Sequence, residues 1–178
     1  LPGFVNEKTL VICSSYSGTT EETLTNAEQT IAKHAKWMAI GTGGKLIEMA
    51  KAAGVPYYQI VPTHNPSNQP RMAIGYSVVG QLALTHYAGI INIADQDIDE
   101  MVTAMESVSK DLRVEIEIEK NMAKQLALKM KGKIIVYASA EHLIGAMHTV
   151  NNQQNENAKN ISMDVVIPEL NHHLMEGL

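Results

Sequence analysis

The stretch that decides the fold is Thr9-Leu10-Val11-Ile12-Cys13-Ser14-Ser15-Tyr16-Ser17-Gly18-Thr19-Thr20-Glu21-Glu22-Thr23. Residues 9–13 are apolar or β-branched, which is typical of a buried strand in a parallel sheet. Leu24, Ala27 and Ile31 then recur at helical spacing, so we expect a helix that begins near Thr20. The pattern Thr19-x-x-Glu22 has the form of a capping box at the start of that helix.

Residues 14–20, here named the serine-threonine turn, join this strand to this helix. Such a turn suits an anion, because free backbone N–H groups and the positive end of the helix dipole point at whatever binds there. Hydroxyl groups add hydrogen-bond donors without charge, which suits a phosphate monoester that is released after each turnover. Ser and Thr are also common helix caps, so the turn alone is equally consistent with a structural role.

The composition limits the possible partners. The 178 residues are 45% hydrophobic and carry a net charge of −5, which suits one domain or two incomplete ones and argues against a nucleic-acid or anionic-membrane partner. No apolar run has transmembrane length and no signal peptide is evident, so we expect a cytoplasmic protein. The single cysteine, Cys13, excludes an intrachain disulfide and is expected to be a core residue. The absence of an initiator Met suggests a piece of a longer polypeptide.

Strands and helices alternate through the first half of the chain. We expect further strands at 37–40 and 55–61, a helix at 46–53 that Gly54 ends, and a helix at 72–87. This order predicts an α/β fold with a doubly wound parallel sheet, whose ligands bind beyond the carboxyl ends of the strands. The serine-threonine turn and Arg71 would both lie at that edge.

Two segments of this half allow alternatives. The glycines at 41–44 precede Lys45 but lack the spacing of a P-loop, so we expect a tight turn. The helix at 72–87 is apolar nearly all round, so it is expected to be buried inside the domain or in a subunit interface.

A second α/β unit follows a helical connector. Acidic residues at 92–100 precede an apolar stripe, which predicts an amphipathic helix between two domains. We expect helix to continue through 115–119 and to end at Gly132. A strand at 133–137, a turn at 138–140, a helix from Leu143 and an extended segment at 163–167 complete the pattern. The predicted domains are therefore 1–90, a connector at 91–123, and 124–178.

Two polar clusters in this second unit could do chemistry. Helical spacing places His148, Asn152 and Glu156 on one face, where a carboxylate among amides is a plausible general base, although composition alone favours a polar helix end at the surface. Glu169-x-x-His172 has a spacing found in carboxylate-bridged metal sites, but no second such pair exists. We therefore expect no metal and favour a histidine that transfers a proton near neutral pH.

Four motifs together resemble one family. They are Ser15-Tyr16-Ser17-Gly18-Thr19-Thr20-Glu21-Glu22-Thr23, Pro70-Arg71, Asn155-Glu156-Asn157-Ala158-Lys159 and Pro168-Glu169-Leu170-Asn171-His172. The chain is similar, over essentially its whole length, to the bifunctional phosphoglucose/phosphomannose isomerases of the sugar isomerase (SIS) superfamily. This resemblance implies tandem SIS domains with doubly wound, flavodoxin/Rossmann-like parallel sheets, both incomplete here. It also implies interconversion of glucose 6-phosphate or mannose 6-phosphate with fructose 6-phosphate, without a cofactor.

The resemblance also implies roles for individual residues. Ser15, Ser17 and Thr20 would hold the 6-phosphate of the sugar. Glu156 would be the base that moves a proton between C1 and C2 through a cis-enediolate, and Arg71 would stabilise the charge of that intermediate. His172 would help to open the pyranose ring. In the wider family this histidine reaches the active site from the partner subunit, which implies a homodimer.

The sequence departs from the family pattern in three places. A glycine-rich segment with a phosphate-contacting Ser, expected before the first motif, is missing here, as is a lysine expected beyond residue 178. His173 stands where the family usually has Asn. Two other functions stay open: a non-catalytic sugar-phosphate sensor, and the isomerase domain of an amidotransferase that makes glucosamine 6-phosphate.

Overall fold

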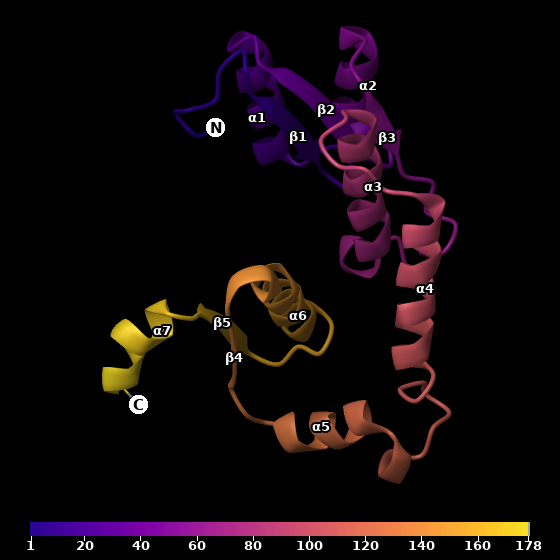
Figure 1. Cartoon of the computed structure of the whole chain (residues 1–178), viewed down its shortest axis with the longest axis vertical. Helices are drawn as coiled ribbons and strands as arrows, with labels where there is room; N and C mark the ends of the chain where they lie inside the picture. Colours follow the sequence, from indigo (N-terminus) through magenta and orange to yellow (C-terminus); the bar gives the residue numbers. More distant parts are fainter. Residues whose placement is uncertain (178) are drawn as a thin grey trace. The chain divides into compact units, whose positions relative to one another are not determined.

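The computed structural model of the chain describes residues 1–177. The chain forms two compact units, one of residues 1–95 and one that begins at Gln96 (Figure 1). Among residues 1–177, no helix is both long enough and apolar enough to span a bilayer.

The first unit is built on a parallel sheet in the order β1-β2-β3. Leu10 of β1 pairs with Lys36 of β2, and Ala39 of β2 pairs with Tyr57 of β3. Three helices follow the strands in turn, with a 3₁₀ turn, η1, before the last of them. The elements are β1 (Leu10–Ser14), α1 (Glu21–Ala32), β2 (Lys36–Gly41), α2 (Gly44–Ala53), β3 (Tyr57–Gln59), η1 (Pro70–Met72) and α3 (Ile74–Tyr87).

The two faces of this sheet are covered by different helices, because successive side chains of a strand point to opposite faces. Cys13, Trp37 and Ala39 pack with buried residues of α1 and α2 on one face. Met38 and Ile40 pack with Leu84 of α3 on the other. The sheet is therefore doubly wound, as the sequence predicts, and Cys13 is the core residue expected.

Four details of the first unit differ from the sequence prediction. β1 is only half-buried, because it pairs with β2 alone. β3 has three residues rather than the seven expected. Thr20, not Thr19, is the N-cap of α1, and its side chain makes no cap hydrogen bond, so the predicted capping box is wrong.

Helix α3 is the fourth difference. Within α3 only Gly80 and Leu84 are buried, whereas Val78 and Val79 are exposed. The prediction that this helix lies inside the domain is therefore wrong. A position in a subunit interface stays a prediction.

The second unit contains a parallel strand pair, in which Ile135 of β4 pairs with Ser162 of β5 and Ser139 with Val166. Met147 and Asn151 are the buried residues of α6, the helix between these strands. The elements are α4 (Asp95–Ser109), η2 (Ile118–Lys120), α5 (Met122–Met130), β4 (Ile135–Ser139), η3 (Glu141–Leu143), α6 (Ile144–Glu156), β5 (Ser162–Val166), α7 (Glu169–His172) and η4 (Leu174–Gly177).

The α-helix expected through residues 115–119 is absent from the described residues, and turns followed by the 3₁₀ helix η2 take its place. Side chains satisfy the backbone there. Asn121, which is fully buried, donates from Nδ2 to the Arg113 carbonyl at 3.0 Å and accepts from the Lys124 N–H at 3.0 Å. The Lys124 ammonium donates to the carbonyls of Val114 and Ile116, each at 2.6 Å. These bonds replace the helical hydrogen bonds of the segment.

Candidate functional site

The serine-threonine turn begins where β1 ends, at the carboxyl edge of the first sheet. The Ser15 N–H donates to the Ile40 carbonyl at 2.9 Å, which extends the pairing of β1 with β2 by one residue. The Gly18 N–H then donates to both the carbonyl and the hydroxyl of Ser15, each at 3.1 Å. Gly18 has φ of +71°, and a Cβ there would lie 1.8 Å from the Gly43 carbonyl oxygen. Only glycine fits this position.

The hydroxyl groups of this turn have different surroundings. Ser15 is buried and shares a hydroxyl–hydroxyl hydrogen bond of 2.7 Å with Thr20. Ser17 and Thr20 are exposed, and Ser17 is bonded to Thr19 at 2.9 Å. The first N–H groups of α1 have no partner within the helix, and no side-chain cap covers them at Thr20. The turn therefore presents backbone and hydroxyl donors at one helix end, which is the arrangement that binds an anion.

The glycines at 41–44 form the tight turn that the sequence predicts. Gly44 has φ of +65°, and a Cβ there would lie 2.6 Å from the Ser17 carbonyl oxygen. The Leu46 N–H at the start of α2 donates to the Gly18 carbonyl at 2.9 Å. Lys45 instead pairs with Glu28 of α1 at 3.3 Å, at the surface. The start of α2 therefore supports the serine-threonine turn through Gly18.

A loop after β3 reaches the same edge and carries Arg71. The Asn65 amide donates to the Tyr16 hydroxyl at 2.8 Å and to the Gln69 carbonyl at 3.0 Å, and Asn65 is buried. The Arg71 guanidinium donates to the side-chain carbonyl of Gln69 at 3.0 Å. Asn65 thus ties the loop that leads to Arg71 to the serine-threonine turn. Sequence reasoning missed Asn65, for which the polar loop after a strand end was the available signal.

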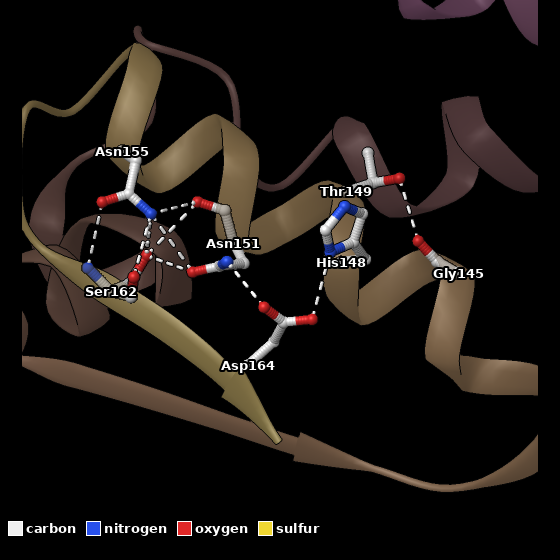
Figure 2. A network of polar contacts seen from close by, with 7 residues as sticks. All are labelled: Gly145, His148, Thr149, Asn151, Asn155, Ser162 and Asp164. Carbon is white, nitrogen blue, oxygen red and sulfur yellow. Dashed lines mark hydrogen bonds and ion pairs between the residues drawn. The ribbon is translucent and has the colours of Figure 1, made fainter. Parts of the chain in front are cut away.

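Glu156 is the last residue of α6, and its side chain is exposed. Among the described residues it forms no ion pair or side-chain hydrogen bond. The face of α6 that meets β5 carries His148, Asn151 and Asn155 rather than the predicted set with Asn152 and Glu156 (Figure 2). Glu156 directly follows Asn155 but does not lie on this face, and its carboxylate is exposed to solvent.

His172 is the last residue of α7, and it is exposed. Its ring contacts the ring of His173 edge-on, with the centroids 4.3 Å apart. Glu169 pairs with His173, four residues later, so the Glu169–His172 pair considered from the sequence does not form. Within residues 1–177, no group of three His, Cys, Asp or Glu side chains is placed to hold a metal ion.

Comparison with known proteins adds a family to this geometry. Residues 119–178 match the model of the bacterial phospho-glucose isomerase C-terminal SIS domain. The chain is 40% identical over 179 aligned residues to the bifunctional phosphoglucose/phosphomannose isomerase of Caldicellulosiruptor bescii, covering 99% of this chain and 51% of that protein. In sequence the chain is similar to the bifunctional phosphoglucose/phosphomannose isomerases. The corresponding enzyme of Aquifex aeolicus is 32% identical, over 99% of this chain and 50% of that protein.

Other relatives define the breadth of this relationship. The D-glucosamine-6-phosphate 4-epimerase of Sulfolobus acidocaldarius is 25% identical, over 97% of this chain and 52% of that protein. A candidate phosphosugar isomerase from Salmonella typhimurium LT2 superposes with a TM-score of 0.61 at 19% identity, over 99% of this chain and 52% of that structure. This likeness shows the shared fold. The chain spans about half the length of the curated relatives it matches.

Proposed function

We propose that the full-length protein is an aldose-ketose isomerase, which interconverts glucose 6-phosphate or mannose 6-phosphate with fructose 6-phosphate. The observation that carries this proposal is that the chain, over 99% of its length, is 40% identical to a bifunctional phosphoglucose/phosphomannose isomerase. The chain also carries the four motifs on which the resemblance rests. The serine-threonine turn, Arg71, Glu156 and His172 would supply its binding and catalytic groups.

In this proposal the serine-threonine turn holds the 6-phosphate. Ser17 and Thr20 would donate hydroxyl hydrogen bonds to the phosphate, together with the first N–H groups of α1. The Ser15 hydroxyl already forms hydrogen bonds with Thr20 and Gly18, which set the shape of the turn. It would bind the phosphate together with the neighbouring Thr20 hydroxyl. Glu21 and Glu22 lie in the same helical turn and would limit the affinity, which favours release of a charged product.

Glu156 would be the base that removes the C1 proton of the ketose, or the C2 proton of the aldose, and returns it to the neighbouring carbon. Its carboxylate has no ion-pair partner among residues 1–177, so it is available to accept a proton. Arg71 would stabilise the negative charge of the cis-enediolate, which is the electrostatic contribution that dominates such reactions. Rotation about C2–C3 would let the same base serve both epimers.

His172 would assist ring opening from the partner subunit of a homodimer. Asn155, the neighbour of Glu156, bonds to the first residue of β5, whereas α7 follows the last residue of β5. The strand between them is about 13 Å long, from four steps of roughly 3.3 Å. Within one chain the length of β5 separates His172 from Glu156, whereas His172 of the partner subunit could approach Glu156 directly. The exposed apolar residues of α3 support an interface between subunits.

Isomerisation in D₂O tests the proposed mechanism. The base takes the C1 proton of fructose 6-phosphate, and while the enediolate exists the protonated base exchanges this proton with solvent. The aldose phosphate that forms when the base protonates C2 should therefore carry deuterium there. Proton NMR of the product measures this incorporation. Complete transfer of the C1 hydrogen of fructose 6-phosphate to C2 of the aldose, with no deuterium gained during turnover, would contradict exchange through an enediolate. Conversion at C4 of glucosamine 6-phosphate instead would move the chain to the epimerase class.

A further inference from the structure

A polar network joins the end of α6 to β5, and it uses residues for which the proposed function gives no role (Figure 2). The Asn155 amide donates to the Ser162 carbonyl at 3.0 Å, and its side-chain oxygen accepts from the Ser162 N–H at 3.1 Å. One carboxamide therefore pairs with both backbone groups of the first residue of β5, as a neighbouring strand would.

This double pairing requires an amide of this length. Aspartate would lose the donor to the Ser162 carbonyl, and leucine, which has the same shape, would lose both bonds. Ser162 is buried, so its unpaired N–H and C=O would then lack water as well. The Ser162 hydroxyl adds further bonds, to Asn155 Nδ2 at 2.9 Å and to Asn151 Oδ1 at 2.6 Å.

The network continues along β5 and holds a second point of α6. The Asn151 amide donates to one oxygen of Asp164 at 2.8 Å, and the other oxygen lies 3.1 Å from Nδ1 of His148. Asn151 is buried, and the Asp164 side chain is 25% exposed. These contacts come from residues 148, 151 and 155, which are successive positions on one face of the helix. They fix both the rotation of α6 and its height along β5.

We propose that Asn155 is a positioning residue. It fixes the last turn of α6 against the start of β5, and so holds the carboxylate of Glu156 within reach of the substrate carbon from which it takes a proton. Glu156 is the next residue in the chain, and within residues 1–177 its side chain makes no hydrogen bond or ion pair that would hold it in place. A helix end is otherwise prone to fray, because its final carbonyl groups have no helical partner. The catalytic consequence rests on the proposed function, whereas the clamp on α6 does not.

The test compares Asn155→Leu with Asn160→Leu in the full-length protein. Asn160 lies in the same α6–β5 connection and donates to the Lys133 carbonyl at 3.0 Å, outside the network, so it is a matched loss of one amide. Leucine introduces no charge beside Glu156. For Asn155→Leu we expect a fall in kcat of about 100-fold, with KM for fructose 6-phosphate changed less than about threefold, because misplacement by about 1 Å has an effect of this size. Asn160→Leu should keep both constants near the parent values.

Hydrogen exchange measured by mass spectrometry gives a second readout that does not depend on activity. Asn155→Leu should speed amide exchange in the last turn of α6 and at the start of β5, while Asn160→Leu should not. Unchanged exchange in Asn155→Leu would overturn the clamp. Faster exchange with an unchanged kcat would overturn the positioning role and leave the proposed function standing. An inactive parent protein with the exchange difference intact would overturn the proposed function, and the catalytic half of the inference with it.

Discussion

Glu156 and His172 lie at opposite ends of β5, because Glu156 ends the helix that packs against the start of the strand and His172 follows its finish. The proposed function needs these side chains at the same sugar. A symmetric dimer satisfies both statements if each active site combines Glu156 of one chain with His172 of the partner subunit.

Mixed dimers test this arrangement. Glu156→Gln and His172→Ala variants should each be nearly inactive alone. After co-refolding at equal concentration, half of the dimers are mixed and each mixed dimer has one intact site, so activity should return to about a quarter of the parent value. The coupled isomerase assay measures this recovery. If both groups act within one chain, every mixture will stay inactive.

Loss of the proposed base should affect chemistry rather than binding. Glu156→Gln should lower kcat by at least about 10³-fold, within the range for general-base groups, and leave the Kd for fructose 6-phosphate within about threefold. Glu115→Gln, an exposed carboxylate of the same unit, is the matched control and should have no effect. Turnover that survives in Glu156→Gln would remove this residue from the role of base.

Gly18→Ala should damage the serine-threonine turn. The φ of +71° and the close Gly43 carbonyl oxygen leave no room for a Cβ, so we expect a loss of at least about 2 kcal/mol in the free energy of unfolding and weaker sugar-phosphate binding. Urea unfolding and calorimetric titration measure the two effects.

Gly75→Ala is the control for that change, because a Cβ at this position in the first turn of α3 would meet no atom within 4 Å apart from its chain neighbours and its own helix backbone. It should be neutral or stabilising by up to about 1 kcal/mol. Equal effects of the two substitutions would mean that the turn tolerates a side chain at residue 18.

The Cys13 thiol should make stability depend on pH in the alkaline range. Burial in the apolar cluster raises the pKa of Cys13 above its ordinary value of 9.0. The unfolded chain then loses this proton at a lower pH than the folded one, so the free energy of unfolding falls as pH rises through and above 9. Below about pH 8 the contribution of Cys13 should be constant.

Urea unfolding of the parent and of Cys13→Ala, at steps between neutral pH and pH 10, checks this expectation. The parent should lose stability more steeply than the variant above pH 9. Parallel curves, or rapid reaction of the native thiol with a disulfide reagent, would show that Cys13 is not held protonated in the core.

The alternation of apolar strands and amphipathic helices predicted the doubly wound fold. A strand that is apolar at every position, such as the one expected at 37–40, needs a helical layer on each face, and its residues Trp37 and Met38 pack into opposite layers. Local patterns predicted less well where helices begin and how far they continue. Thr19-x-x-Glu22 suggested a capping box, yet Thr19 bonds to Ser17 and Thr20 to Ser15. The alternation at 115–119 could not reveal that the Lys124 ammonium would donate to the Ile116 carbonyl in that segment.

Residue spacing along the chain also could not predict the hydrogen bonds that hold the candidate site residues in place. Asn65 reaches Tyr16 across 49 residues, and Asp164 reaches His148 across 16. Helical spacing placed Glu156 on one face with His148 and Asn152. In the structure the helix instead turns Asn151 and Asn155 toward β5, where they form hydrogen bonds with Ser162 and Asp164. Such contacts depend on how strands and helices pack, which no local pattern encodes.

The measurement that tests the central claim most directly is a coupled isomerase assay on the full-length protein, with glucose 6-phosphate and mannose 6-phosphate supplied separately and no metal added. The account predicts that both sugars are converted to fructose 6-phosphate and that Glu156→Gln removes both activities together. Binding of both sugars without conversion of either would contradict the account, and would make the protein a sugar-phosphate sensor in which Glu156 and His172 have no catalytic role.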